Sequence, residues 1–121
     1  MGDTCPRVLM VEDTPPLARL YQEYLRFEEI ELEVVDCGQD ALDAINQDET
    51  DAILLDLRLP DMDGLEILLW IREWNLPSEV VIITAHGSVN TAFEVMRNGP
   101  YDFLVKPFSS DRLTVMLKNV L

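Results

Sequence analysis

Short aliphatic runs alternate with amphipathic stretches along the whole chain. Five such runs predict strands, near residues 7–12, 32–37, 51–56, 79–84 and 101–105. Most of these runs are continuously rich in Val, Ile and Leu instead of alternating with polar residues. Continuous apolar runs are typical of strands that are covered on both faces.

Between these runs, apolar residues recur at the spacing of helices. The third helix opens on Asp63 and Glu66, which have the spacing of a capping box, and extends to about residue 74. Gly99 ends the fourth helix, and Ser109 or Ser110 precedes the fifth. Strands and helices therefore alternate from one end of the chain to the other.

This alternation predicts an α/β fold, a doubly wound parallel (βα)5 sheet with helices on both faces, because crossovers between parallel strands are right-handed. No repeat, linker or low-complexity segment interrupts the pattern, so we expect residues 1–121 to form one domain. Ligands of such sheets bind beyond the carboxyl ends of the strands, where the winding reverses.

Composition excludes several classes of partner. The 121 residues contain 9 Lys and Arg against 23 Asp and Glu, which gives a net charge of −14. Such a surface repels nucleic acid and anionic membranes, so we expect no direct contact with either. No apolar stretch approaches the roughly 20 residues that a membrane span needs.

The two cysteines do not indicate a disulfide. Cys5 precedes the first predicted strand and Cys37 ends the second, so the two thiols should lie at opposite edges of the sheet. Reduced thiols are typical of a cytoplasmic protein, which is the expected location.

Three predicted strands end on charged residues, namely Glu12-Asp13, Asp56 and Lys106. A buried strand that stops on a charge is costly unless the charge has a partner. Since the carboxyl ends of parallel strands share one edge of the sheet, these acids and the lysine should meet there. An acidic helix N-terminus would account for one of the acids, but not for three groups that converge from separate strands.

Clustered carboxylates at such an edge predict a Mg²⁺ site, because Mg²⁺ prefers carboxylate oxygens, waters and a phosphate oxygen. We expect Asp13 and Asp56 as direct ligands, Glu12 acting through water, and a backbone carbonyl near Arg58.

Asp56 is also a candidate nucleophile, since a carboxylate that attacks a phosphoryl donor forms an aspartyl phosphate. Mg²⁺ and Lys106 would neutralise the charge on the transferring group. Thr84 ends the fourth strand, where its hydroxyl would bond a phosphoryl oxygen. The alternative for Asp56 is a capping residue of the following turn, and the single histidine, His86, is interpreted as an incidental loop residue.

Four motifs occur in a diagnostic order: Val11-Glu12-Asp13, the segment from Leu55 to Gly64, Thr84-Ala85 and Lys106-Pro107. With them the chain resembles, from Arg7 to Leu121, the receiver domain of bacterial two-component response regulators. The resemblance implies a flavodoxin-like sheet of strand order 2-1-3-4-5. It also implies Mg²⁺-dependent phosphoryl transfer from a sensor histidine kinase or a phosphotransfer protein, in a signalling switch that is not a turnover enzyme.

By motif, Asp56 would be the phosphoacceptor and Lys106 its phosphate partner, with a cis peptide bond before Pro107. Thr84 and Phe103 would form the switch: Thr84 moves toward the phosphoryl group and Phe103 fills the vacated space. The surface of the fourth helix, fifth strand and fifth helix would then change its partner or form a dimer. Phe stands at residue 103 where the family often has Tyr.

The segments at residues 84–88 and 101–108 resemble more particularly the NtrC class, and within it LuxO-type regulators. Those regulators join the receiver to an AAA+ ATPase that works on sigma-54 polymerase and to a DNA-binding helix-turn-helix. Neither output domain is expected within residues 1–121.

Two other classes stay open as alternatives. An aspartyl-phosphate hydrolase would carry its nucleophile on the first strand, with a second Asp two residues later, which Glu12 to Thr14 do not provide. A flavodoxin-like mononucleotide binder would need a Gly- or Ser/Thr-rich loop after the first strand, where this chain has two prolines.

Overall fold

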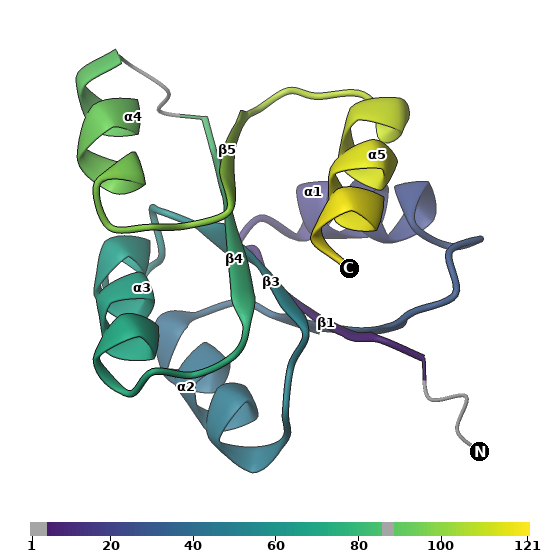
Figure 1. Ribbon diagram of the computed structural model, residues 1–121. Helices are drawn as coiled ribbons and strands as arrows, with labels where there is room; N and C mark the ends of the chain where they lie inside the picture. Colours follow the sequence, from purple (N-terminus) through teal and green to yellow (C-terminus); the bar gives the residue numbers. More distant parts are fainter. Residues whose placement is uncertain (1–4, 86–88) are drawn as a thin grey trace.

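The computed structural model describes residues 5–85 and 89–121, in which five strands alternate with five helices (Figure 1). The strands are β1 (Arg7–Val11), β2 (Glu31–Val35), β3 (Ala52–Asp56), β4 (Glu79–Thr84) and β5 (Asp102–Val105). The helices are α1 (Pro15–Tyr24), α2 (Gly38–Gln47), α3 (Gly64–Glu73), α4 (Val89–Met96) and α5 (Ser110–Val120). The strands match the predicted ones within one or two residues at their ends, and α3 ends one residue before the predicted residue 74.

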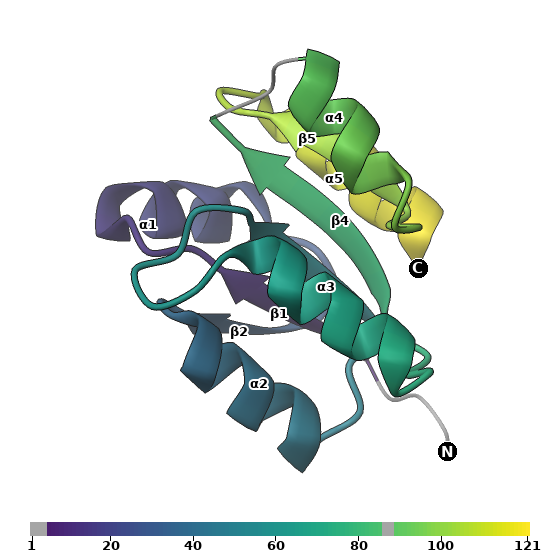
Figure 2. The same cartoon turned by 90° about the vertical axis from the view of Figure 1, so that its left-hand side faces the viewer.

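All five strands are parallel and follow the order β2-β1-β3-β4-β5. Helices α1 and α5 cover one face of the sheet, and α2, α3 and α4 cover the other, as the two views show (Figures 1 and 2). The predicted doubly wound α/β fold and its strand order are therefore confirmed.

The continuous apolar runs have a simple explanation in the packing. Along β3, Ala52 and Leu54 belong to the hydrophobic cluster under α1 and α5. Ile53 and Leu55 belong to the cluster under α2, α3 and α4. Successive side chains of a strand point to opposite faces, so a sheet that is covered on both faces needs apolar residues at every position.

The register brings the ends of the central strands to one level. Val11 of β1 pairs with Leu55 of β3, Asp56 pairs with Ile83 of β4, and Thr84 pairs with Val105 of β5. The residues that follow β1 and β5, and those that end β3 and β4, consequently lie at the same edge of the sheet.

Helix termini follow the predicted chemistry. Asp63 and Glu66 form a reciprocal capping box at the start of α3, and the Ser109 side chain accepts a hydrogen bond from the Arg112 N–H at the start of α5. Gly99, just after α4, has a positive φ of 76°. A glycine adopts this conformation without the steric cost that other residues incur.

Three single residues complete the description of the fold. Cys5 and Cys37 are both free thiols. Trp74 is 64% exposed, although the helix that precedes it is largely apolar. Trp74 is the C-cap residue of α3. Among the described residues, no helix has both the length and the apolar content to cross a membrane.

Candidate functional site

One lysine joins two strand ends at the carboxyl edge of the sheet. Lys106 Nζ, just after β5, lies 2.5 Å from Glu12 Oε1 and 2.8 Å from Asp56 Oδ2. The three side chains are almost inaccessible to solvent, with exposed fractions of 8%, 0% and 7% for Lys106, Glu12 and Asp56. The strand ends that the sequence singled out therefore meet in a buried ionic cluster.

A third carboxylate lies beside this cluster. Oxygens of Glu12, Asp13 and Asp56 all lie within 4.8 Å of one another, and the Asp13 side chain is exposed. This donor set consists only of carboxylate oxygens, which suits a hard divalent cation such as Mg²⁺. Because Asp13 is exposed, solvent reaches this side of the cluster, and Mg²⁺ usually retains several waters.

The protonation equilibria of the site reflect its burial. Burial raises the pKa of Glu12, and its hydrogen bonds with Lys106 and the Thr14 N–H offset this only in part. Burial alone would lower the pKa of Lys106, but its hydrogen bonds to Asp56 and Glu12 outweigh burial and raise that pKa. Lys106 thus remains an ammonium that contacts two carboxylates, with the third carboxylate, Asp13, beside them. A divalent cation would balance the excess of acidic groups.

Backbone hydrogen bonds orient both buried carboxylates. The Thr14 N–H donates to Glu12 Oε2 at 3.1 Å, and the Arg58 N–H donates to Asp56 Oδ1 at 3.1 Å. Each carboxylate therefore uses one oxygen for Lys106 and the other for a backbone amide of its own loop. Lys106 and the backbone amides together therefore fix the orientation of both carboxylates.

The expected switch residues lie on the neighbouring strands. Thr84 is fully buried at the end of β4, and its carbonyl accepts a hydrogen bond of 2.8 Å from the Lys106 N–H. Phe103 is half-buried on β5 and packs against the cluster under α2, α3 and α4. The Lys106–Pro107 peptide bond is cis. His86 lies outside the described residues.

Two contacts near the site were missed by sequence reasoning. The Tyr21 ring, buried on α1, stacks on Phe108 with a centroid separation of 4.9 Å, two residues after Lys106. Asp61, in the loop after β3, accepts two backbone hydrogen bonds from α2. Phe108 follows the Lys106-Pro107 motif and Asp61 lies in the motif that ends at Gly64, but the partners of both residues are distant in the chain.

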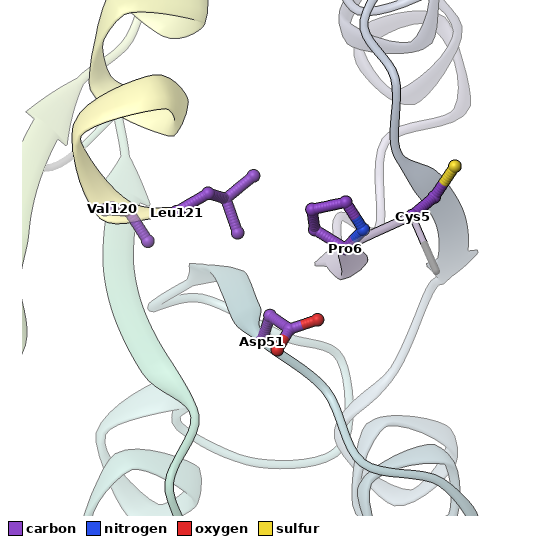
Figure 3. A pocket seen from close by; sticks show the side chains of 5 residues that line it. All are labelled: Cys5, Pro6, Asp51, Val120 and Leu121. Atoms are coloured by element: carbon purple, nitrogen blue, oxygen red, sulfur yellow. The ribbon is translucent and has the colours of Figure 1, made fainter. Parts of the chain in front are cut away.

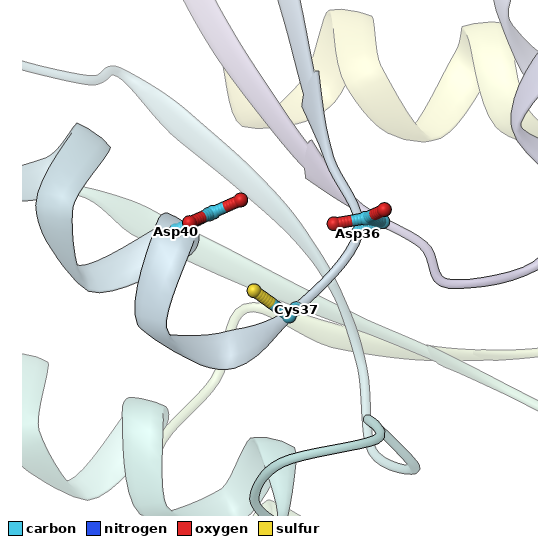
Figure 4. Close-up of side chains that lie close together, drawn as sticks. All are labelled: Asp36, Cys37 and Asp40. Atoms are coloured by element: carbon cyan, nitrogen blue, oxygen red, sulfur yellow. The ribbon is translucent and has the colours of Figure 1, made fainter.

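Other polar features lie away from this cluster. Asp36 at the end of β2, together with Cys37 and Asp40 of the α2 start, forms a second group of metal-ligating atoms within 4.8 Å of one another (Figure 4). A hollow at the opposite, amino edge of the sheet is lined by residues of both chain ends and of the turn before β3 (Figure 3). Neither feature contains a lysine buried against carboxylates, as the cluster around Lys106 does.

Comparison with known proteins identifies the fold family. The family model of the response regulator receiver domain matches residues 8–118. The chain belongs to this family. The receiver domain is a signalling module of two-component systems that accepts a phosphoryl group, and it is not a metabolic enzyme.

Individual relatives agree with this assignment. The regulatory protein LuxO of Vibrio cholerae is 47% identical over 112 residues, which cover 93% of this chain and 25% of that protein. AtoC of Escherichia coli is 30% identical over 115 residues, covering 95% of this chain and 25% of AtoC. The crystal structure of a LuxO receiver domain from Vibrio parahaemolyticus has a TM-score of 0.94 at 42% identity, covering 97% of this chain and 90% of that one.

These matches confirm the resemblance to LuxO-type regulators of the NtrC class. The chain spans about a quarter of the length of the curated relatives LuxO and AtoC. Family membership also favours the receiver interpretation over a hydrolase or a mononucleotide binder.

Proposed function

We propose that residues 1–121 act as one receiver unit that takes a phosphoryl group onto Asp56 in the presence of Mg²⁺. The donor is a sensor histidine kinase or a phosphotransfer protein. The observation that carries this proposal is the meeting of Lys106 with Glu12 and Asp56 beside Asp13, in a cluster that opens to solvent on one side. The unit catalyses its own phosphorylation and dephosphorylation and does not turn over a free substrate.

In the proposed reaction, an oxygen of Asp56 forms a bond to phosphorus while the bond from phosphorus to the donor nitrogen breaks. The donor imidazole leaves with the electron pair of that bond. Lys106 is already bonded to Asp56 Oδ2 and would stay close to the transferred group, where its ammonium stabilises the added negative charge. The Arg58 N–H holds the other Asp56 oxygen in a fixed orientation.

The cation would be held by Asp13 and Asp56 directly, by Glu12 through water, and by the Arg58 backbone carbonyl. When bound, it supplies positive charge to the oxygens of the transferring phosphoryl group. The carboxylate-only donor set and the excess of acidic groups over Lys106 support this assignment.

The response to phosphorylation would be a two-state change. Thr84 would bond a phosphoryl oxygen and Phe103 would turn into the space that Thr84 leaves, so that the surface formed by α4, β5 and α5 changes shape. An almost complete change of population requires about 5.5 kcal/mol of differential affinity. Among the side chains that the structure describes on α4 and β5 and between them, four large apolar ones are exposed: Phe93, Met96, Tyr101 and Val105. Their exposure supports a role of this surface in binding an output domain or a second copy.

The proposed downstream partner is the protein's own output region, an AAA+ ATPase with a helix-turn-helix that regulates sigma-54-dependent transcription in the cytoplasm. Support comes from the LuxO and AtoC relatives, which are about four times longer than the matched region. The net charge of −14 supports the expectation that this domain does not itself contact DNA.

The proposal is tested by treating the protein with a small phosphoryl donor and Mg²⁺ and weighing it intact. Wild type should gain one phosphoryl group, and Asp56→Asn should gain none. Asp51→Asn is the matched control. Asp51 directly precedes the first residue of β3, whereas Asp56 is its last, and the Asp51 side chain accepts a hydrogen bond from the Arg7 N–H. The proposal fails if wild type gains no phosphoryl group, or if Asp56→Asn gains as much as wild type.

A further inference from the structure

Asp61 connects the loop after β3 to a different helix. This loop, residues 57–63, leads from Asp56 to α3, but Asp61 Oδ1 accepts the Gly38 N–H of α2 at 2.7 Å. Its Oδ2 accepts the Gln39 N–H at 2.9 Å. Amides in the first turn of a helix have no partner within the helix. The residue at the N-cap of α2, Cys37, forms no side-chain cap, so Asp61 provides from a distance what the local sequence lacks.

A close apolar contact accompanies these hydrogen bonds. A Cβ atom added to Gly38 would lie 2.3 Å from Met62 Cγ and 2.6 Å from its sulfur. Met62 therefore occupies the space that a side chain at residue 38 would need. Two consecutive residues of the loop, Asp61 and Met62, are thus fastened to the first residue of α2.

The other end of the loop is fastened to the start of α3. The Gly64 N–H donates to the Leu57 carbonyl at 2.7 Å, and Arg58 forms an isolated antiparallel bridge with Asp63. The Arg58 N–H also bonds Asp56 Oδ1. Arg58 thus lies in a short loop that is anchored on α3 and, through Asp61, on α2.

The charge of Asp61 suits this anchoring role. A carboxylate is stabilised at the positive end of a helix dipole. The hydrogen bonds from Gly38 and Gln39 hold the pKa of Asp61 below its ordinary value, so the side chain is an anion at neutral pH.

We propose that Asp61 is a positioning residue for the cation site: by holding the loop against α2, it sets the position of the Arg58 backbone carbonyl relative to Asp56. This inference rests on the proposed function, which assigns that carbonyl to the cation. Residues that orient metal ligands typically change metal affinity about 10- to 100-fold when they are removed. Asp61 acts on the backbone ligand only indirectly, through its hydrogen bonds to Gly38 and Gln39. The effect of its removal on Mg²⁺ affinity should therefore fall at the lower end of that range.

The experiment measures Mg²⁺ binding by calorimetric titration of the unphosphorylated protein. Asp61→Ala should raise the Mg²⁺ concentration for half-saturation about tenfold. Asp61→Asn keeps one acceptor oxygen and should give an intermediate value. Asp43→Ala is the matched control. It removes one exposed carboxylate, which accepts a hydrogen bond from the side chain of Gln39 and not from a backbone amide at the start of α2. This variant should leave Mg²⁺ binding unchanged.

Hydrogen exchange at the Gly38 and Gln39 amides should become faster in Asp61→Ala, which verifies that the two hydrogen bonds are lost. A further readout separates positioning of the cation site from a purely structural cap. Saturating Mg²⁺ should return the phosphorylation rate of that variant to near the wild-type rate. If Asp61→Ala lowers the melting temperature but leaves the Mg²⁺ half-saturation unchanged, Asp61 only caps α2 and the inference is overturned.

Failure of the proposed function gives a different result. Wild type that binds Mg²⁺ in an Asp61-dependent way but gains no phosphoryl group overturns the proposed function and supports the positioning role. Wild type that binds no Mg²⁺ overturns both.

Discussion

A basic side chain lies between two carboxylates at the carboxyl edge of the sheet, where the strands end, and another at the amino edge, where the strands begin. At the carboxyl edge, Lys106 contacts Glu12 and Asp56, and it joins the ends of β1, β3 and β5. All three side chains have exposed fractions of 8% or less.

At the amino edge, Arg7 lies 3.1 Å from Glu31 and 3.5 Å from Asp48. It joins the starts of β1 and β2 to the segment before β3. The Arg7 side chain is 40% exposed, and its partners are 62% and 61% exposed.

The same pairing pattern therefore has different consequences at the two edges. Exposed ion pairs are screened by water and salt, so the amino-edge network contributes little to stability. Buried charges lose their hydration, and removing one partner leaves the others uncompensated. The carboxyl edge keeps charged groups where they are costly, which is typical of a site with a function.

The largest effect is expected at the buried lysine. Lys106→Met leaves Glu12 and Asp56 as buried carboxylates without their ammonium partner. The free energy of unfolding at neutral pH should fall by about 3 kcal/mol. Urea denaturation without Mg²⁺ measures this change. A variant as stable as wild type would show that the carboxylates find other partners, and the contrast between the edges would be lost.

A smaller loss is expected where the backbone of the carboxyl edge is tightly packed. A Cβ atom on residue 64 would lie 2.1 Å from the Asp56 carbonyl oxygen and 2.9 Å from the Leu57 Cα. Backbone atoms cannot move aside as a flexible side chain can, so Gly64→Ala should cost about 2 kcal/mol. The same denaturation experiment measures it.

Gly99→Ala provides a comparison for Gly64→Ala, because a Cβ there meets only the end of the Arg72 side chain, at 3.4 Å. Its cost comes from the positive φ of residue 99. A smaller loss at residue 64 than at residue 99 would contradict the crowding argument.

The smallest effect is expected at the exposed arginine. Arg7→Met keeps the aliphatic part of the side chain and removes the ion pairs with Glu31 and Asp48. The free energy of unfolding should fall by no more than about 0.5 kcal/mol. Repeating the denaturation at high salt should shrink the difference from wild type further. A loss as large as that of Lys106→Met would remove the distinction between the two edges.

Much of the fold could be predicted from the sequence, because its signals are local. Continuous aliphatic runs indicate strands that are buried on both faces, and the capping box at Asp63 marks the start of α3. The convergence of Glu12, Asp56 and Lys106 was also predictable, since parallel strands bring their carboxyl ends to one edge.

Other features depend on contacts that no local pattern specifies. The bonds from α2 to Asp61 join residues 23 and 22 positions apart, and they depend on how the loop after β3 lies against that helix. The 64% exposure of Trp74 was not predictable either, because an apolar residue at the end of a largely apolar helix carries no sign of its own orientation. The sequence predicted that Lys106 lies near these acids, but only the side-chain positions show that it pairs with both Glu12 and Asp56.

Neighbouring residues of β5 face separate interiors, and this has a consequence for how a signal would spread. Phe103 packs into the cluster under α2, α3 and α4, whereas Leu104 belongs to the cluster under α1 and α5. The sheet thus separates two hydrophobic cores, one on each face. A rearrangement that begins at Phe103 would first change the packing of α2, α3 and α4, which share its core. The contacts of α1 with the core on the other face would not be directly affected.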